Sequence, residues 1–235
     1  MTTPRARARA RTMDDILRIG REHLATEGAA ALSLRAVARD LGVVSSAVYR
    51  YVASRDELLT LLVIDAYDDL GNTVDEALVD VHDPAERFRA LGRAVRGWAL
   101  REPARYALVF GSPVPGYHAP AERTTEPGTR VVTHLVRILA DAHAAGALTA
   151  RDTVAVSDTL AADLRRIRRD LAVDLPDEVL ARGVLVWAGL FGTVSFEVFG
   201  QYGTDTFADP AAVFEHHLAV LAESAGFIPA QRAAR

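Results

Sequence analysis

Three short helical segments lie in the first 55 residues, and a tight glycine turn joins the second to the third. The first has apolar residues at helical spacing over Met13–Leu24 and reaches Gly28, a position suited to a helix C-cap. The second starts at Ser33 and ends at Gly42, and the third covers about Ser45–Val52. Two short helices joined by such a turn are typical of a helix-turn-helix.

The third segment has two chemically different faces. Val48 and Val52 are four residues apart and face inward, whereas Ser46, Tyr49 and Arg50 share the opposite face. A recognition helix presents small, hydroxyl-bearing and basic side chains to base edges and phosphates. Taken singly, each of these residues is more often a packing or solvated residue. Their combination on one very short helix predicts contact with DNA.

Charge is distributed unevenly along the chain. The formal net charge is −4, yet residues 1–55 carry +5 and the remainder carries −9. A basic module on an acidic body favours a nucleic-acid partner. Residues 1–11 are expected to form a flexible basic arm, which either adds affinity for phosphates or only solubilises the terminus; its arginines are Arg5, Arg7, Arg9 and Arg11.

The rest of the chain also has helical periodicity. Ser54 and Glu57 form an S-x-x-E capping box, and Asp83-Pro84 and Asp209-Pro210 each pair an N-cap residue with proline at the first helical position. The Pro- and Gly-rich segment 111–120 is expected to be a loop. Further helices are predicted over about 128–145, 152–171, 177–200 and 210–224. The fold class is therefore all-α, with a three-helix DNA-binding domain followed by a helical-bundle domain.

Residues 12–60 resemble the DNA-binding domain of the TetR/AcrR family of transcriptional regulators. Apolar, turn and capping positions agree in register, from Ser33 through Leu41-Gly42-Val43 and Val48-Tyr49 to the Ser54 capping box. The resemblance implies that eight residues meet DNA, either at base edges or at the backbone: Arg35, Ser45, Ser46, Ala47, Tyr49, Arg50, Tyr51 and Arg55. In two departures from the family pattern, Val44 stands where Ser is frequent and Arg55 replaces the usual Lys.

The later segments Pro103–Tyr117 and Trp187–Gly192 resemble the WHG type of C-terminal domain in the same family. That resemblance implies a small-molecule site between helices and dimerisation through the last long helices. Ligand pockets are mostly apolar with a few polar groups, and the candidate lining residues are Trp98, Tyr106, Phe110, Tyr117, His134 and Trp187. Each of these aromatic residues is individually more often part of a plain core.

The helix expected over 177–200 is apolar nearly all round. Such a helix must be buried on every side, either between its own core and a partner subunit or at the centre of a monomer. We favour dimerisation because two-fold readers of DNA need paired half-sites. The candidate interface residues are Leu160, Leu164, Leu190, Phe191, Val194 and Phe199.

These features predict a ligand-responsive regulator, most simply a repressor, that binds a near-palindromic operator as a homodimer. The expected domains are an arm (1–11), a DNA-binding domain (12–60), a ligand-binding and dimerisation domain (61–228) and a tail (229–235). The alternative is a helical small-molecule-binding or adaptor protein that does not use its DNA module. An enzyme is disfavoured, because Gly-x-Ser-x-Gly, Walker, dinucleotide and HExxH motifs are absent from the sequence.

Other sequence features limit location and cofactors. No apolar segment follows the N-terminal arginines, and the charge-free run 183–196 is shorter than the roughly 20 residues of a membrane span. The chain is therefore expected to be soluble and cytoplasmic. It has no cysteine and its histidines show no metal-ligand spacing, so neither a metal nor another cofactor is assigned.

Overall fold

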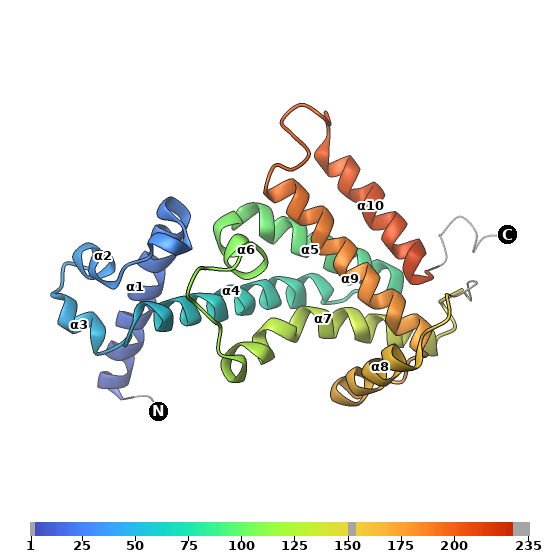
Figure 1. Cartoon of the computed structure of the whole chain (residues 1–235), viewed down its shortest axis with the longest axis horizontal. Helices are drawn as coiled ribbons and strands as arrows, with labels where there is room; N and C mark the ends of the chain where they lie inside the picture. The colour runs from blue at the N-terminus through green and yellow to red at the C-terminus, as the bar shows by residue number, and fades with distance from the viewer. Residues whose placement is uncertain (1–2, 150–153, 228–235) are drawn as a thin grey trace. The chain divides into compact units, whose positions relative to one another are not determined.

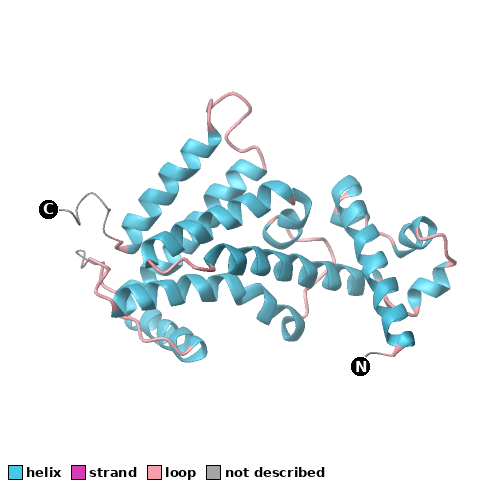
Figure 2. Ribbon diagram, turned by 180° about the vertical axis from the view of Figure 1, so that it is seen from behind, coloured by secondary structure: helices cyan, strands magenta, loops and turns pink. Residues whose placement is uncertain are grey.

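The computed structural model describes residues 3–149 and 154–227, and this part of the chain is helical without strands (Figures 1 and 2). The all-α prediction is therefore confirmed. In chain order the helices are α1 (Pro4–Glu27), the short 3-10 turn η1 (Ala29–Ala31), α2 (Leu34–Asp40), α3 (Ser45–Tyr49), α4 (Arg55–Leu78), α5 (Pro84–Arg101), α6 (Pro103–Phe110), α7 (Ala121–Ala144), α8 (Asp158–Leu171), α9 (Asp177–Val198) and α10 (Pro210–Ala225).

The chain forms two compact units. The first unit contains residues up to Asp69 together with Arg101–Gly128, and the second contains Leu70–Leu100 together with the chain from Thr129 onward. The boundary expected at residue 60 therefore lies inside α4, and the first unit also takes in α6 and the loop after it. The physical reason is that α1 packs against α6 as well as against α2.

The core of the first unit is built from the predicted inward faces. Ile16, Val37, Val48 and Val52 are each nearly or completely buried in one apolar cluster with the start of α4. Burying an aliphatic side chain of this size contributes about 1.5–3 kcal/mol relative to leaving it exposed. The valines under α3 therefore hold that short helix in place.

Residues 4–11 are helical, which corrects the expectation of a flexible arm. Thr3 caps α1 by accepting a hydrogen bond from the Ala6 N–H at 3.2 Å, and Pro4 occupies the first turn. Alanine and arginine, which alternate here, are both strong helix formers. This part of the helix has no apolar period, so hydrophobic periodicity in the sequence does not reveal it. Residues 1 and 2 of the expected arm, and the whole tail 229–235, lie outside the described residues.

Three of the predicted helix starts after residue 50 are confirmed at their caps. Ser54 Oγ accepts from the Glu57 N–H at 3.1 Å, and Asp83 Oδ1 accepts from the Glu86 N–H at 2.8 Å. Asp209 Oδ1 accepts from the N–H groups of the second and third residues after it, at 3.0 and 3.1 Å. Two starts differ from expectation: α7 begins seven residues earlier than 128, with Pro127 inside it, and α8 begins at Asp158 after a Ser157 cap.

In the second unit, α9 and α10 lie side by side (Figure 1). Gly189 allows this close approach, because a Cβ there would lie 2.6 Å from Leu221 Cδ2. Gly183 likewise makes room for Leu139 of α7, with a corresponding distance of 2.8 Å. Glycine thus places one side of α9 against two neighbouring helices.

Candidate DNA-binding surface

The turn before α3 and the valine beneath it set the orientation of this helix. Gly42 has a φ of 70°, in the left-handed region where glycine is favoured, and the following Val43 N–H donates to Ala38 O at 3.0 Å. Val48 is only 2% exposed. Because this face is buried, the opposite face of α3 points outward.

The three side chains expected on the outer face of α3 are all exposed: Ser46, Tyr49 and Arg50. Tyr49 is 47% exposed although it is aromatic. The helix is shorter than expected, since it ends at Tyr49 with Arg50 as its C-cap residue. Its N-cap, Val44, provides no side-chain hydrogen bond, and Ser45 is the first helical residue rather than the cap.

The other expected DNA contacts have more varied surroundings. Arg35, at the start of α2, is exposed. Ser45 and Ala47, both in α3, are half-buried. Tyr51 is half-buried, packs against the core of the first unit, and has the Arg9 guanidinium 5.1 Å above the centre of its ring. Its position is therefore fixed by the protein itself.

Arg55 makes contacts within the protein instead of projecting freely. Its Nη2 donates to Ala29 O at 3.0 Å and to Ala30 O at 3.1 Å, and its Nη1 lies 3.5 Å from an Asp56 carboxylate oxygen. These bonds attach the start of α4 to η1. The expected phosphate contact must therefore compete with a structural role that sequence reasoning did not foresee.

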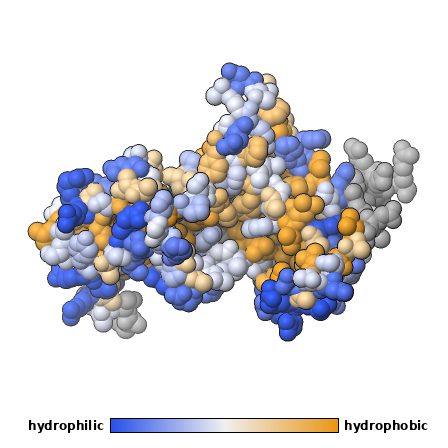
Figure 3. Space-filling model, in the orientation of Figure 1, coloured by the Kyte–Doolittle hydropathy of each residue, from blue (hydrophilic) through white to orange (hydrophobic). Residues whose placement is uncertain are grey.

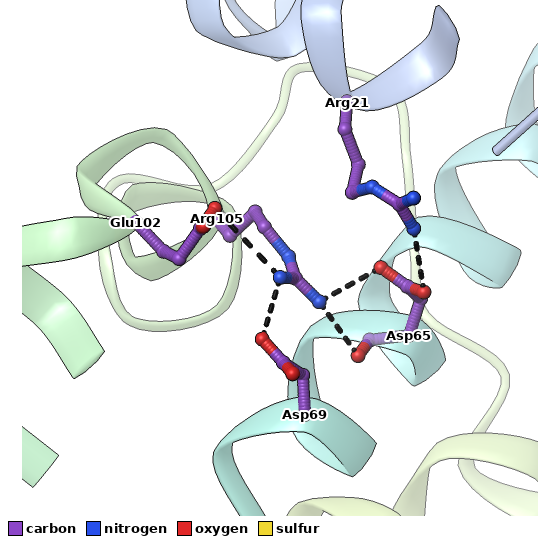
Figure 4. A network of polar contacts seen from close by, with 5 residues as sticks. All are labelled: Arg21, Asp65, Asp69, Glu102 and Arg105. Carbon is purple, nitrogen blue, oxygen red and sulfur yellow. Dashed lines mark hydrogen bonds and ion pairs between the residues drawn. The ribbon is translucent and has the colours of Figure 1, made fainter. Parts of the chain in front are cut away.

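A network of ion pairs around the buried Arg105 holds α1, α4 and α6 together (Figure 4). Arg105 of α6 donates to Asp69 at 2.6 Å and to Asp65 at 2.8 Å, and a carboxylate oxygen of Glu102, the N-cap residue of α6, lies 3.7 Å away. Arg21 of α1 donates to the other carboxylate oxygen of Asp65 at 2.9 Å. The only sequence signal for this network was the four-residue spacing of Asp65 and Asp69, which puts both carboxylates on one face of α4.

A second interhelical contact joins the first two helices of the same unit. His23 Nε2 and Asp40 Oδ2 lie 2.6 Å apart, which connects α1 to the end of α2. The hydrogen bond from His23 lowers the pKa of the Asp40 carboxyl. Together with the buried valines, this contact fixes the frame on which α3 is carried.

The six expected ligand-lining residues do not form one cluster within either unit. Tyr106, Phe110 and Tyr117 belong to the first unit, whereas Trp98, His134 and Trp187 belong to the second. Tyr106 and Trp98 are completely or almost completely buried, as plain core residues would be.

The three ligand candidates of the first unit have close neighbours there. Phe110 packs on Tyr106 with a centroid distance of 5.1 Å and meets Tyr67 edge-on at 6.1 Å. Burial raises the pKa of the Tyr67 hydroxyl. Tyr117 and Thr60 form a hydroxyl pair at 3.0 Å. These three candidates therefore pack together with Tyr67 and Thr60 inside the first unit.

The polar candidate of the second unit already has a partner. His134 Nε2 lies 2.5 Å from Asp75 Oδ1, and Arg130 forms an ion pair with the same carboxylate. Burial acts to raise the pKa of Asp75, but the hydrogen bonds from Arg130 and His134 outweigh it, so the pKa lies below its usual value. Trp187 stacks on Phe191 at 4.3 Å.

The expected dimer residues need a correction. Leu164, Leu190 and Val194 are at most 1% exposed within their own subunit, and Phe191 is only 9% exposed. Leu190, Phe191 and Val194 form the side of α9 that packs on its own unit, and Leu164 is the buried residue of α8, so none of the four lies on an accessible face. Leu160 and Phe199 are exposed, as an interface requires.

The accessible side of α9 carries a different apolar set. Val184, Leu185 and Phe196 are between 50 and 63% exposed, and Figure 3 shows hydrophobic surface along this helix. Gly192 lies on the same side, where a Cβ would meet no atom within 4 Å. By length and composition α9 is the one described helix that could cross a membrane, although a third of its most apolar window is buried in the protein.

A helix-turn-helix with an outward α3, in a chain whose described remainder is all-helical, is the architecture of a helix-turn-helix transcriptional regulator. Residues 16–62 match the family model for bacterial regulatory proteins of the tetR family, and residues 88–221 match the tetracyclin repressor-like C-terminal domain. The chain belongs to the TetR family of transcriptional regulators. The family and its related regulators are not enzymes.

Individual relatives agree with this assignment. The chain is 50% identical over 222 residues to the HTH-type transcriptional regulator Rv1816 of Mycobacterium tuberculosis, covering 92% of this chain and 94% of the relative. The crystal structure of the regulatory protein SCO4313 is 36% identical, with a TM-score of 0.75 over 93% of this chain and 98% of that one. The fatty acid degradation regulator FadR of Bacillus halodurans, at 13% identity and a TM-score of 0.62 over 89% and 97%, supports the fold alone.

Proposed function

We propose that this transcriptional regulator is a ligand-responsive repressor that binds a near-palindromic operator as a homodimer. The observation that carries the proposal is the outward projection of Ser46, Tyr49 and Arg50 from a helix anchored by buried Val48. A short helix of this kind fits the major groove, where its first residues reach base edges.

The eight candidate residues divide by chemistry in this proposal. Ser45, Ser46 and Ala47 are small enough for close approach to the bases, and Arg50 reaches a guanine edge or a phosphate. Arg35, Tyr49 and Tyr51 contact the sugar-phosphate backbone and fix the register. Arg55 acts mainly by bracing η1, because its guanidinium is bonded there.

The proposed dimer forms through the exposed apolar side of α9, extended by Leu160 and Phe199. Large apolar side chains gathered on one accessible helix face are characteristic of a protein interface. A two-fold pair would place the two recognition helices one DNA turn apart, about 34–36 Å. The same pairing covers the face that makes α9 resemble a membrane span, and it agrees with a soluble, cytoplasmic protein.

The proposed effector is a small apolar or amphipathic molecule. The aromatic group of Tyr67, Tyr106 and Phe110, with the nearby Thr60–Tyr117 hydroxyl pair, supports this class of ligand. An effector that prefers a conformation with another spacing of the recognition helices shifts the population and releases DNA. The second candidate function, an adaptor with an unused DNA module, has no comparable observation in its favour.

The deciding experiment starts by selecting operator sequences from a random duplex library with the purified protein. Binding of the selected duplex is then compared for wild type, Tyr49→Phe, Arg50→Ala and the control Arg137→Ala, which removes an exposed arginine of α7. Loss of a good base contact should weaken binding by about 1–3 kcal/mol, or roughly 5- to 150-fold. The proposal fails if no sequence is enriched, or if Tyr49→Phe and Arg50→Ala both bind as wild type does.

A further inference from the structure

The first two turns of α1 extend beyond the core of the first unit. Every residue from Thr3 to Arg11 is exposed, and the first buried residue of the helix is Ile16. Burial of an apolar face therefore does not hold this segment in place. Most helices in proteins owe their stability to such burial, so a different interaction must account for its position and composition.

The segment is attached to the end of the recognition helix. The Arg9 guanidinium lies 5.1 Å above the centre of the Tyr51 ring, a cation–π geometry. The Tyr51 N–H in turn donates to Val48 O of α3 at 2.8 Å. In both Figure 1 and Figure 2 the start of α1 accordingly runs beside α3. The protruding turns thus lie next to the surface proposed to meet DNA.

The charge on these turns has one sign. Residues 3–13 contain four arginines and no acidic residue, and the first carboxylates are those of Asp14 and Asp15. Asp15 already lies 3.5 Å from Arg18. Among the described interactions, none pairs Arg5, Arg7 or Arg11 with a carboxylate. These guanidinium groups are available to an external anion.

Helical spacing sorts the arginines into two pairs. Arg5 and Arg9 are four residues apart and share the face that meets Tyr51, while Arg7 and Arg11 share a face on the other side. Each like-charged pair destabilises an isolated helix by roughly 0.2–0.5 kcal/mol. An anionic surface beside the helix would remove this repulsion and favour the helical form.

We propose that the first two turns of α1 are a second DNA-contacting element, which binds backbone phosphates next to the base pairs that α3 reads. The inference rests on the proposed function, because it needs α3 to bring the protein to a duplex. The element adds affinity without adding sequence preference, since phosphates carry no base identity. The competing interpretation is that these arginines only solubilise the terminus.

The test compares three proteins on two duplexes over a series of salt concentrations. The variant R5Q/R7Q/R9Q/R11Q removes the charges and keeps a good helix former at each position. The charge-matched control R137Q/R165Q/R166Q/R169Q removes four exposed arginines of α7 and α8. The duplexes are the selected operator and a mixed-sequence duplex of equal length.

The proposal predicts that the N-terminal variant loses affinity to a similar extent on both duplexes. Each phosphate contact that is removed should lower the slope of log affinity against log salt concentration by about 0.9. The N-terminal variant should therefore bind both duplexes more weakly and with a shallower slope, leaving the ratio of operator to mixed-sequence affinity within about twofold of wild type. The α7 and α8 variant should keep the wild-type slope.

The outcomes separate this inference from the proposed function. If wild type fails to prefer the operator, the proposed function fails first. If wild type prefers the operator but the N-terminal variant keeps its affinity and slope, the proposal of a second DNA-contacting element is refuted and the proposed regulator function stands.

The variant R5Q/R7Q leaves the Arg9–Tyr51 contact intact, so a shallower salt slope in this variant shows that the effect does not come from a displaced α3. An unchanged slope in this variant, together with a fall in melting temperature of the quadruple variant, would also overturn the proposal.

Discussion

Arg105 of α6 bonds Asp65 of α4 twice through a single nitrogen: Nη2 donates to the carboxylate at 2.8 Å and to the backbone carbonyl at 2.9 Å. Arg21 of α1 reaches the same carboxylate from the other side. Asp65 is thus the point at which three helices of the first unit are held together. The carboxylate of Asp65 is therefore paired from two helices at once.

Replacement of Arg105 should therefore destabilise the first unit. We expect Arg105→Met to lower the free energy of unfolding by about 2 kcal/mol, because hydrogen bonds to two carboxylates are lost and the apolar stem is kept. Urea unfolding followed by circular dichroism measures the change. Arg101→Met, at the exposed arginine that ends α5, is the control, and equal midpoints for the two variants would contradict the assigned role.

Arg55 and Arg50 should differ in what their loss affects. Arg55→Gln breaks the bonds to η1 and is expected to cost about 1.5–3 kcal/mol of stability, with a smaller effect on DNA affinity after correction for the unfolded fraction. Arg50→Gln should weaken DNA binding strongly and change stability little. Thermal melting and gel-shift titration of both variants test this, and the same pattern in both proteins would show that the two arginines do not have separate roles.

Asp75 should make the second unit sensitive to acid. Its pKa is lowered in the folded state, so the stabilisation is present above the ordinary aspartate value of about 3.9 and is lost as the pH falls through the lowered folded value. Asp75→Asn cannot ionise, so the stability difference from wild type should shrink below about pH 4. Urea midpoints between pH 7 and pH 3 measure it, with Asp170→Asn controlling for the loss of one charge. A difference that stays constant with pH would exclude this carboxylate as a source of acid sensitivity.

Charges on the exposed side of α9 should separate the proposed dimer. Leu185→Asp and Phe196→Asp each place a carboxylate on an accessible apolar face, so the fold should remain intact while the pairing weakens by tenfold or more, about 1.4 kcal/mol. Light scattering after gel filtration at several concentrations gives the mass. Val154→Asp changes a residue that is 92% exposed outside α9 and serves as control. A dimer that persists in both α9 variants would place the interface elsewhere.

The helix-turn-helix could be predicted from local signals alone. Glycine at position 42 allows the left-handed turn between α2 and α3. The four-residue spacing of Val48 and Val52 predicts that both valines face the core. Together these features predict which face of α3 is exposed. The caps at Ser54, Asp83 and Asp209 are equally local, because a side chain bonds an N–H two or three residues away. These predictions did not depend on the tertiary structure.

Three other features could not be predicted from local patterns in the sequence. One side of α9 packs on α10 and α7, and the other side stays exposed. Because the helix is apolar nearly all round, its sequence does not show which side is exposed. The chain has 27 basic residues, and only the fold shows that Arg105 is the buried one among those that the structure describes. The first turns of α1 are helical through propensity and capping, so they have no apolar periodicity by which the sequence could predict them.

Gly192 leaves the exposed side of α9 without a side chain at that position. Glycine within a helix is less favourable than alanine by about 0.5–1 kcal/mol, and a Cβ at this position would have no described atom within 4 Å. A single copy of the chain therefore gains nothing from glycine here. In the proposed dimer the bare backbone would be a seat for a second copy, so this missing methyl group would exchange some stability of the monomer for closer assembly.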